Sequence, residues 1–209
     1  MSAAVAEPNS AGPGHDCTLC PRLVDFRMVQ RAAHADWHNA PVPSFGNISA
    51  RLLIVGLAPG LKGANRTGRP FTGDYAGDLL YATLKKFSFA RGDYAQHKDD
   101  GLTLIDCRVS NAARCVPPEN KPLPEEVATC RQFLIAEIAA MPKLRAILAL
   151  GQIAHGAVLS ALGQRKSAFA FKHAAMHALL DGSLLADSYH CSRYNTNTGK
   201  LTTAMFETV

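Results

Sequence analysis

The sequence predicts an α/β fold, a three-layer sandwich in which a central, mainly parallel four-stranded sheet is flanked by helices. Short apolar runs alternate along the chain with longer stretches whose apolar residues recur at helical spacing. Most of the short runs are nearly continuous in apolar residues, which is typical of parallel strands covered on both faces. Alternation of such strands with helices indicates a layered fold around a parallel sheet.

Four runs are predicted to be the strands. They are RLLIV, LTLIDC, AILAL and LLADSY, at residues 51–55, 102–107, 146–150 and 184–189. These lengths are usual for strands in globular proteins. No apolar run approaches the ~20 residues that a membrane-spanning helix requires.

Three segments between these strands are predicted to be helices. Residues 79–87 carry apolar side chains at helical spacing, and residues 152–162 directly follow the third strand and its terminal glycine. Residues 124–141 open with Pro-Glu-Glu, which is a favourable first helical turn.

Length and composition are those of one globular domain. The chain has 209 residues, of which 47% are hydrophobic and 19% are charged, enough for a sizeable core. Residues 1–15 are small, polar and rich in Pro and Gly, so we expect a disordered leader followed by a single domain over residues 16–209. Because the leader lacks the features of a secretory signal, we expect a cytoplasmic protein whose cysteines form no disulfides. We also expect it to be a monomer. The net charge of +5 favours a polyanionic partner.

The loop at residues 56–77, GLAPGLKGANRTGRPFTGDYAG, is the most distinctive segment. It follows the first strand and contains six glycines, three cations and, before its last glycine, the acid Asp74. Glycine lets the backbone approach a ligand and present its N–H groups, and neighbouring cations suit a negatively charged group. Residues 111–118 follow the second strand and residues 190–199 the fourth. Because ligands bind at the carboxyl ends of parallel strands, the three loops predict one site at one edge of the sheet.

Four of the six cysteines are candidate metal ligands. Cys17 and Cys20 form a CxxC pair after the leader, and Cys115 and Cys130 lie fifteen residues apart. A redox CxxC pair is expected between a strand and a helix, and no strand is predicted before Cys17. Four such thiolates suit a tetrahedral zinc ion or a [4Fe–4S] cluster, and spacing alone does not separate these from structural cysteines without metal. Cys107 ends an apolar run and is expected to be a buried core thiol.

Several blocks of the chain resemble the type B (family 5) uracil-DNA glycosylases. They are CTLCPRL, PVPSFGN, GLAPG, GANRTGRPFTGD, NAARCVPPENK and SYHCSRYNTNTGKLT, which together extend over nearly the whole chain after the leader. The resemblance implies a DNA repair enzyme that hydrolyses the N-glycosidic bond of uracil in DNA, and of other deaminated bases such as hypoxanthine. It also implies a [4Fe–4S] cluster on Cys17, Cys20, Cys115 and Cys130.

By this resemblance Asp74 and His190 are the catalytic candidates. The enzyme must flip the nucleotide out of the duplex, and it needs donors aimed at the departing base and negative charge or an oriented water near the sugar. Asp74 would assist the water or stabilise the sugar cation, and His190 would donate to a base oxygen. Asp78, the rival acid, is interpreted as a helix N-cap. Apart from Lys62 the loops hold no lysine nucleophile, so we expect hydrolysis without strand cleavage.

Other residues of these loops are assigned to the base pocket. The side-chain amide of Asn111 would recognise the edge of the base, and the ring of Phe71 would stack on it. Leu57 stands where related glycosylases keep a polar residue, which moves the chemistry onto Asp74. The pocket wall is predicted to be the first motif, Gly56, Leu57, Ala58, Pro59 and Gly60.

Cations and an exposed loop are predicted to contact DNA. Phosphate contacts of this kind position a protein without reading sequence. Cys191 replaces the proline expected after His190, which bears on the shape of the loop. The phosphate candidates are Lys62, Arg66, Arg69 and Lys200, and the loop candidates for a wedge that enters the duplex are Ser192, Arg193, Tyr194 and Asn195. The alternative is a nucleic-acid-binding module with a structural iron–sulfur or zinc site and no catalysis, which would need neither Asp74 nor His190.

Overall fold

The fold is built on a five-stranded sheet, in a computed structural model that describes residues 12–209. The strands follow the order β4, β1, β5, β7, β6 across the sheet, and the first four run parallel. They are β4 (Cys107–Asn111), β1 (Leu52–Gly56), β5 (Ala146–Leu150), β7 (Leu184–Ser188) and the antiparallel edge strand β6 (Met176–Ala178). The predicted α/β class and mainly parallel sheet are confirmed, with one strand more than expected.

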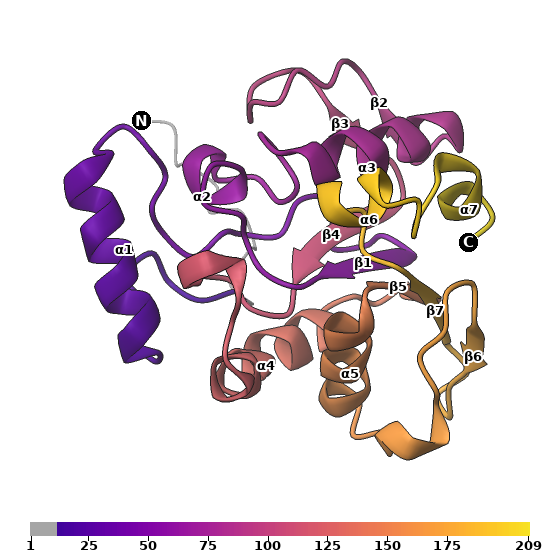
Figure 1. Cartoon of the computed structure of the whole chain (residues 1–209). Helices are drawn as coiled ribbons and strands as arrows, with labels where there is room; N and C mark the ends of the chain where they lie inside the picture. The colour runs from indigo at the N-terminus through magenta and orange to yellow at the C-terminus, as the bar shows by residue number, and fades with distance from the viewer. Residues whose placement is uncertain (1–11) are drawn as a thin grey trace, which may run out of the picture.

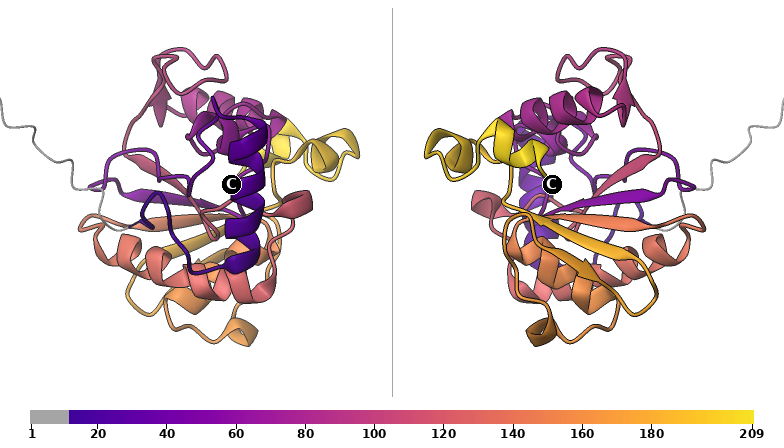
Figure 2. Two further views of the ribbon diagram at one scale, coloured as in Figure 1. Left: turned by 90° about the vertical axis from the view of Figure 1, so that its left-hand side faces the viewer. Right: turned by 90° about the vertical axis from the view of Figure 1, so that its right-hand side faces the viewer.

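Helices cover both faces of this sheet (Figures 1 and 2). Leu53 and Val55 of β1 belong to one core with α4 (Pro124–Ala139) and α5 (Gln152–Ala161). Ile54 belongs to the opposite core with α3 (Tyr75–Lys86) and α7 (Thr203–Glu207). Successive side chains of a strand point to opposite faces, so a single apolar run supplies both cores and the three layers follow.

The remaining elements lie around the sandwich. Helix α1 (Pro21–Ala33) stands to one side of it (Figure 1) and is tied to α4 by an ion pair of Arg22 with Glu126, at 2.7 Å. None of the helices in the described part of the chain is long and apolar enough to cross a membrane. The short elements are α2 (Ala64–Thr67), α6 (Arg193–Asn197), the hairpin of β2 (Ala90–Arg91) with β3 (Thr103–Leu104), and the 3-10 turns η1 (Pro118–Asn120) and η2 (Lys166–Ala168).

The prediction of a second strand at residues 102–107 is wrong. Residues 103–104 form strand β3, which pairs with β2 in a separate two-stranded sheet, and the strand of the main sheet starts at Cys107 and continues through Arg108 and Ser110. These polar residues are buried because the carboxylate of Glu137, on α4, accepts from Arg108 Nε and from Ser110 Oγ, each at 2.8 Å. A buried acid therefore offsets the cost of burying polar groups in a strand. Cys107 is fully buried, as expected.

Other boundaries differ for local reasons. Strand β6 is short and half exposed at the sheet edge, and α1 leaves Met28 and Val29 exposed, so neither carries a clear apolar pattern. Helix α3 starts at Tyr75 with Asp74 at its N-cap, so the assignment of Asp78 as N-cap is wrong. Residues 1–11 of the predicted leader lie outside the described residues. Its last residues are held in place, since His15 contacts Arg31 at 3.1 Å.

Candidate active site

One cavity of about 600 Å³ lies where the three predicted loops meet, at the carboxyl edge of the sheet. That volume is in the range of small-molecule sites. Residues 57–60 of the first motif line it after β1, Phe71 and residues 74–76 line it at the start of α3, and His190, Ser192 and Arg193 line it from the loop after β7, whereas Gly56 of the predicted wall does not. The predicted residues that it brings together are Leu57, Ala58, Pro59, Gly60, Phe71, Asp74, Asn111, His190, Ser192 and Arg193.

Hydrogen bonds between neighbouring strand ends fix the first motif. The carbonyls of Gly56 and Leu57 accept from the N–H groups of Ala112 and Ala113, each at 2.9 Å, so the pairing of β1 with β4 continues into the loops. A methyl group on Gly56 would collide with Asn111 Oδ1 and lie 2.5 Å from the Phe71 ring. Gly56 therefore allows the amide and the ring to sit against the backbone.

Asp74 is enclosed by the glycine-rich loop. A methyl group on Gly60 would lie 2.8 Å from Asp74 Oδ2, and one on Gly63 would collide with the same oxygen. The other oxygen, Oδ1, is buried with no hydrogen-bond partner among the described residues. Burial raises the pKa of Asp74, and the N–H groups of Gly77 and Ala76 counter this only in part. The carboxylate is thus weakly solvated and has a free oxygen, which suits a general base or an electrostatic partner for a cation.

His190 faces the same cavity from the loop after β7. Its ring stacks on that of Phe71, with centroids 5.9 Å apart and planes at 28°. The carbonyl of His190 accepts from Asn195 Nδ2 at 2.8 Å. Burial lowers the pKa of His190 to about 4, so near neutral pH the ring is an uncharged imidazole that can donate one N–H.

Phe71 holds an unfavourable backbone conformation beside this ring. Its φ angle is 51°, in the left-handed region that bulky residues avoid. The carbonyl of Phe71 accepts from Tyr94 Oη at 3.1 Å, and Gly77 approaches so closely that a side chain there would collide with it. Strain of this kind persists where the surroundings enforce it, and such positions concentrate at functional sites.

Asn111 is the last residue of β4 and pairs in register with Gly56. The residue is buried, and its Oδ1 has no partner among residues 12–209. An unsatisfied buried amide oxygen costs free energy. The free Oδ1 of Asn111 therefore fits a site in which a ligand supplies the missing hydrogen-bond donor.

The cations predicted to contact phosphate fall into two groups. Lys62, Arg66 and Lys200 are exposed. The assignment of Arg69 is wrong, because its side chain is buried and makes a bidentate pair with Asp100, at 2.7 and 2.8 Å. Its guanidinium also packs over the Phe45 ring, 5.1 Å from the centroid. Arg69 therefore anchors the loop from inside.

The wedge candidates also divide. Ser192 Oγ caps α6 by accepting from the Asn195 N–H at 3.4 Å, and Asn195 in turn holds His190. Arg193 and Tyr194 project outward, and 74% of Tyr194 is exposed. Cys191 is fully buried below them. Ser192 and Asn195 therefore stabilise the loop, and Arg193 and Tyr194 are its exposed side chains.

The pocket is also lined by Tyr75, a weaker candidate than Phe71 for stacking on the base, and by three residues that were not predicted: Ala64, Ala76 and Asn120. Asn120 Oδ1 accepts from the Leu61 N–H at 3.2 Å and so joins the loop after β4 to the first motif. Both Glu119 and Asn120 have positive φ. The Pro-Pro-Glu-Asn turn is the signal that could have drawn attention to Asn120.

Comparison with known proteins agrees with this geometry. The model of the uracil DNA glycosylase superfamily matches residues 43–209. This chain belongs to that superfamily. Among relatives named Type-5 uracil-DNA glycosylase, that of Thermus thermophilus is 46% identical over 91% of this chain and 89% of its own length. Those of Mycobacterium leprae and Pyrobaculum aerophilum are 42% and 39% identical, over 92% and 90% of this chain and 88% and 83% of their own lengths.

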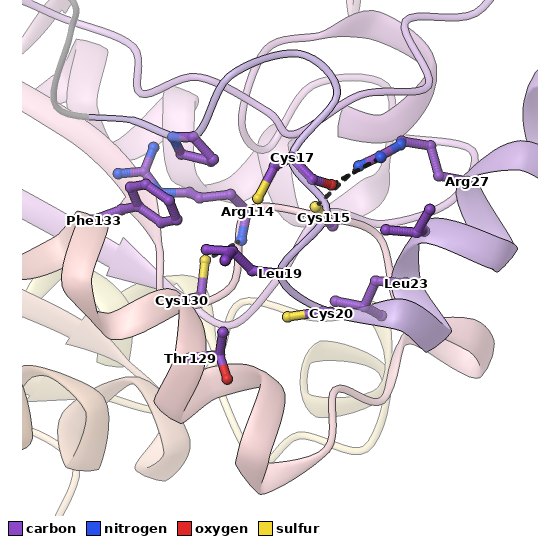
Figure 3. Close-up of a pocket in the computed structure, with 12 residues that line it drawn as sticks. Cys17, Leu19, Cys20, Leu23, Arg27, Arg114, Cys115, Thr129, Cys130 and Phe133 are labelled. Atoms are coloured by element: carbon purple, nitrogen blue, oxygen red, sulfur yellow. Dashed lines mark hydrogen bonds between the residues drawn. The ribbon is translucent and has the colours of Figure 1, made fainter.

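A second site in this superfamily member lies at the start of α1 (Figure 3). The four candidate cysteines line one small cavity between the N-terminal segment, the loop after β4 and α4. The backbone N–H of Arg114 lies 3.4 Å from Cys130 Sγ. Burial, followed by the charge of Cys130, raises the pKa of Cys115 to about 12, and burial also raises the pKa of Cys20 and Cys130. Thiolates gathered here call for a bound cation, so the residues fit a metal centre.

Proposed function

We propose that this protein hydrolyses the N-glycosidic bond of uracil in DNA and leaves an abasic site. One observation supports the proposal most directly: a single cavity joins a buried carboxylate, a neutral imidazole, an unpaired amide and a strained aromatic ring. The carboxylate belongs to Asp74, the imidazole to His190, the amide to Asn111 and the aromatic ring to Phe71. The name of the relatives, Type-5 uracil-DNA glycosylase, gives the substrate of those proteins and agrees with this chemistry.

Each group has a role in the reaction. Phe71 stacks on the flipped base, and Asn111 bonds its Watson–Crick edge through the free Oδ1 and the amide N–H. As the C1′–N1 bond breaks, its electron pair goes to the base, and His190 stabilises the charge by donating N–H to a base oxygen. Water then bonds to C1′, and Asp74 takes its proton. The carboxylate also stabilises the sugar cation before water attacks.

We further propose that the pocket takes other deaminated bases such as hypoxanthine. The side-chain amide of Asn111 offers both a donor and an acceptor. The cavity, at about 600 Å³, does not restrict the site to bases as small as uracil. The exposed cations Lys62, Arg66 and Lys200 would contact phosphate, and Tyr194 with Arg193 would fill the vacated stack. We also propose that the protein acts on DNA as a monomer in the cytoplasm.

The test is a base-release assay on duplexes that carry uracil, hypoxanthine or undamaged bases. We expect free base and an intact strand with an abasic site, because Lys62 does not line the cavity. Strand cleavage without added base would contradict the hydrolytic assignment. If the wild-type protein bound DNA but released no base from any duplex, the alternative of a non-catalytic binding module would stand.

We propose a [4Fe–4S] cluster on Cys17, Cys20, Cys115 and Cys130. The four cysteines line one small cavity, and four thiolates are the ligands that hold a [4Fe–4S] cluster. The resemblance of the surrounding motifs to the type B glycosylases favours this cluster over a zinc ion. The cluster would staple the N-terminal segment to α4 and the β4 loop.

Iron and sulfide content, together with the absorption of anaerobically purified protein, test this assignment. We expect about four irons per chain for a [4Fe–4S] centre, and Cys115→Ser should lower this content while Cys107→Ser leaves it unchanged. Zinc in place of iron would contradict the cluster but leave the glycosylase proposal untouched.

A further inference from the structure

Arg27 is a buried cation that lies against the cysteine site. It sits on α1, which begins directly after Cys20, and is 3% exposed. Its Nη2 donates to the Cys17 carbonyl at 2.9 Å, and its Nη1 lies 3.9 Å from Cys115 Sγ (Figure 3). The guanidinium therefore bridges the N-terminal pair and the distal pair of cysteines.

Arg27 differs in its partners from the other buried arginines. Arg69 pairs with Asp100, and both Arg108 and Arg114 pair with Glu137. For Arg27, no carboxylate lies within ion-pair distance in the part of the chain that the structure describes, and its Nε has no hydrogen-bond partner there either. A buried charge without a counter-charge is costly, so the site lacks an anion next to Arg27.

Metal-bound cysteines would supply that anion. Four thiolates outweigh the positive charge of a zinc ion or an iron–sulfur core, so the occupied centre carries net negative charge beside the guanidinium. Hydrogen bonds to cluster sulfurs and nearby charge are among the main determinants of reduction potential. A charged donor to sulfur contributes in both ways.

We propose that Arg27 is the charge-compensating residue of the metal–thiolate centre, and that it raises the reduction potential of the cluster and slows its loss. The inference rests on the iron–sulfur centre proposed above. Positive charge favours the state with one more electron, so its removal must lower the potential. Removal of the Arg27 charge also removes an attraction that holds the thiolates together.

The experiment compares Arg27→Gln with Arg27→Lys, which keeps the charge, and with Arg31→Gln as matched control. Arg31 lies one helical turn further along α1 and pairs with the exposed Asp16 at 2.7 Å. Three readouts are needed in the full-length holoprotein: iron content, reduction potential by protein-film voltammetry, and the rate at which visible absorption fades with excess chelator.

For Arg27→Gln we expect at least tenfold weaker electron affinity, or about 59 mV for a one-electron couple, and faster iron loss. Arg27→Lys should lie between Arg27→Gln and wild type, and Arg31→Gln should match wild type. A potential and loss rate unchanged in Arg27→Gln would overturn the inference and leave the cluster standing.

Two further outcomes are decisive. If Arg27→Gln fails to load iron, Arg27→Lys must load it, because the charge is retained. If neither variant loads iron, the centre requires the shape of the Arg27 side chain rather than its charge, and the inference is overturned. Wild-type protein without iron would refute the cluster, and the inference with it, before any variant is compared.

Discussion

The imidazole of His190 stacks on the ring of Phe71, with centroids 5.9 Å apart. One partner is kept uncharged by burial, and the other is held at a φ of 51°. This pair lines one side of the proposed base pocket, and the lowered pKa of His190 gives a direct prediction about pH.

Stability should fall as the pH decreases from about 6.5 towards 4, in part because of His190. The pKa of this residue is lowered by burial from 6.5 to about 4. Within that window an unfolded chain binds a proton that the folded chain does not, so acid favours unfolding. His190→Gln should show a shallower decrease of melting temperature between pH 7 and pH 5. His97→Gln, at an exposed position, should keep the wild-type slope, and equal slopes in all three proteins would refute the assignment.

Asp74→Asn should be more stable than wild type at neutral pH and far less active. Burial raises the pKa of Asp74, so the carboxylate costs stability once the pH exceeds that pKa. Loss of a general base typically lowers the rate by about 10²–10⁴-fold. Single-turnover base release and thermal unfolding measure the two effects. Unchanged release of uracil would remove Asp74 from the mechanism.

The activity of the wild-type protein should depend on the ionisation of Asp74. Because Asp74 must be ionised to act, the rate of base release should fall on acidification through a pKa above 3.8, the ordinary value for this group. The acidic limb of the single-turnover pH profile measures it, and the limb should vanish in the residual activity of Asp74→Asn.

Gly56→Ala should impair catalysis by displacing Asn111 and Phe71. A methyl group there would collide with Asn111 Oδ1 and the Phe71 ring, and overpacking of this kind costs about 1–3 kcal/mol. We expect reduced kcat and weaker discrimination among bases. Gly14→Ala is a suitable control, since a methyl group at Gly14 meets no atom within 4 Å. Wild-type kinetics in Gly56→Ala would show that the contact is not needed.

Tyr194→Ala should slow base release from duplex DNA more than from single strands. The side chain is 74% exposed at the start of α6, and stacking of an aromatic ring on a base contributes about 1–3 kcal/mol. We therefore expect roughly a tenfold lower kcat/KM on duplexes. An equal loss on both substrates would mean that Tyr194 does not replace the flipped base.

Arg69→Ala should destabilise the protein, whereas Lys62→Ala should weaken DNA binding. Removing one partner of a buried pair costs about 3–5 kcal/mol, and Arg69 is bound to Asp100. Loss of one phosphate contact lowers the dependence of log affinity on log salt by about 0.9. Denaturant unfolding and salt titration of binding separate the two roles. A reduced salt slope in Arg69→Ala with normal stability would restore the original phosphate assignment.

The sequence predicted what local pattern and motif spacing encode. The strand at residues 146–150 and the N-terminal bounds of α4 and α5 are as predicted, because apolar runs and a helix-starting proline mark them. The meeting of Asp74, Asn111 and His190 in one cavity followed from their places at the end of a strand or in the loops that follow strands. These features depend on chain order rather than on side-chain packing.

The sequence did not reveal which buried polar residues are paired with a partner on a distant element. Strand β4 was displaced in the prediction because Arg108 and Ser110 resemble surface residues until Glu137, on another element, is known to bond them. Arg69 looked like a phosphate ligand until Asp100 was found beside it. Both errors concern polar groups whose burial depends on a partner 27 to 31 positions away.

The segment that contains Asn111 and Cys115 is shared by two sites. Asn111 lines the base cavity and Cys115 the cysteine cavity, while Arg114 between them bonds Glu137 and contacts Cys130. The proposed base pocket and the proposed metal centre therefore share one short stretch of backbone. A change in the length of this stretch would displace residues of both sites at once.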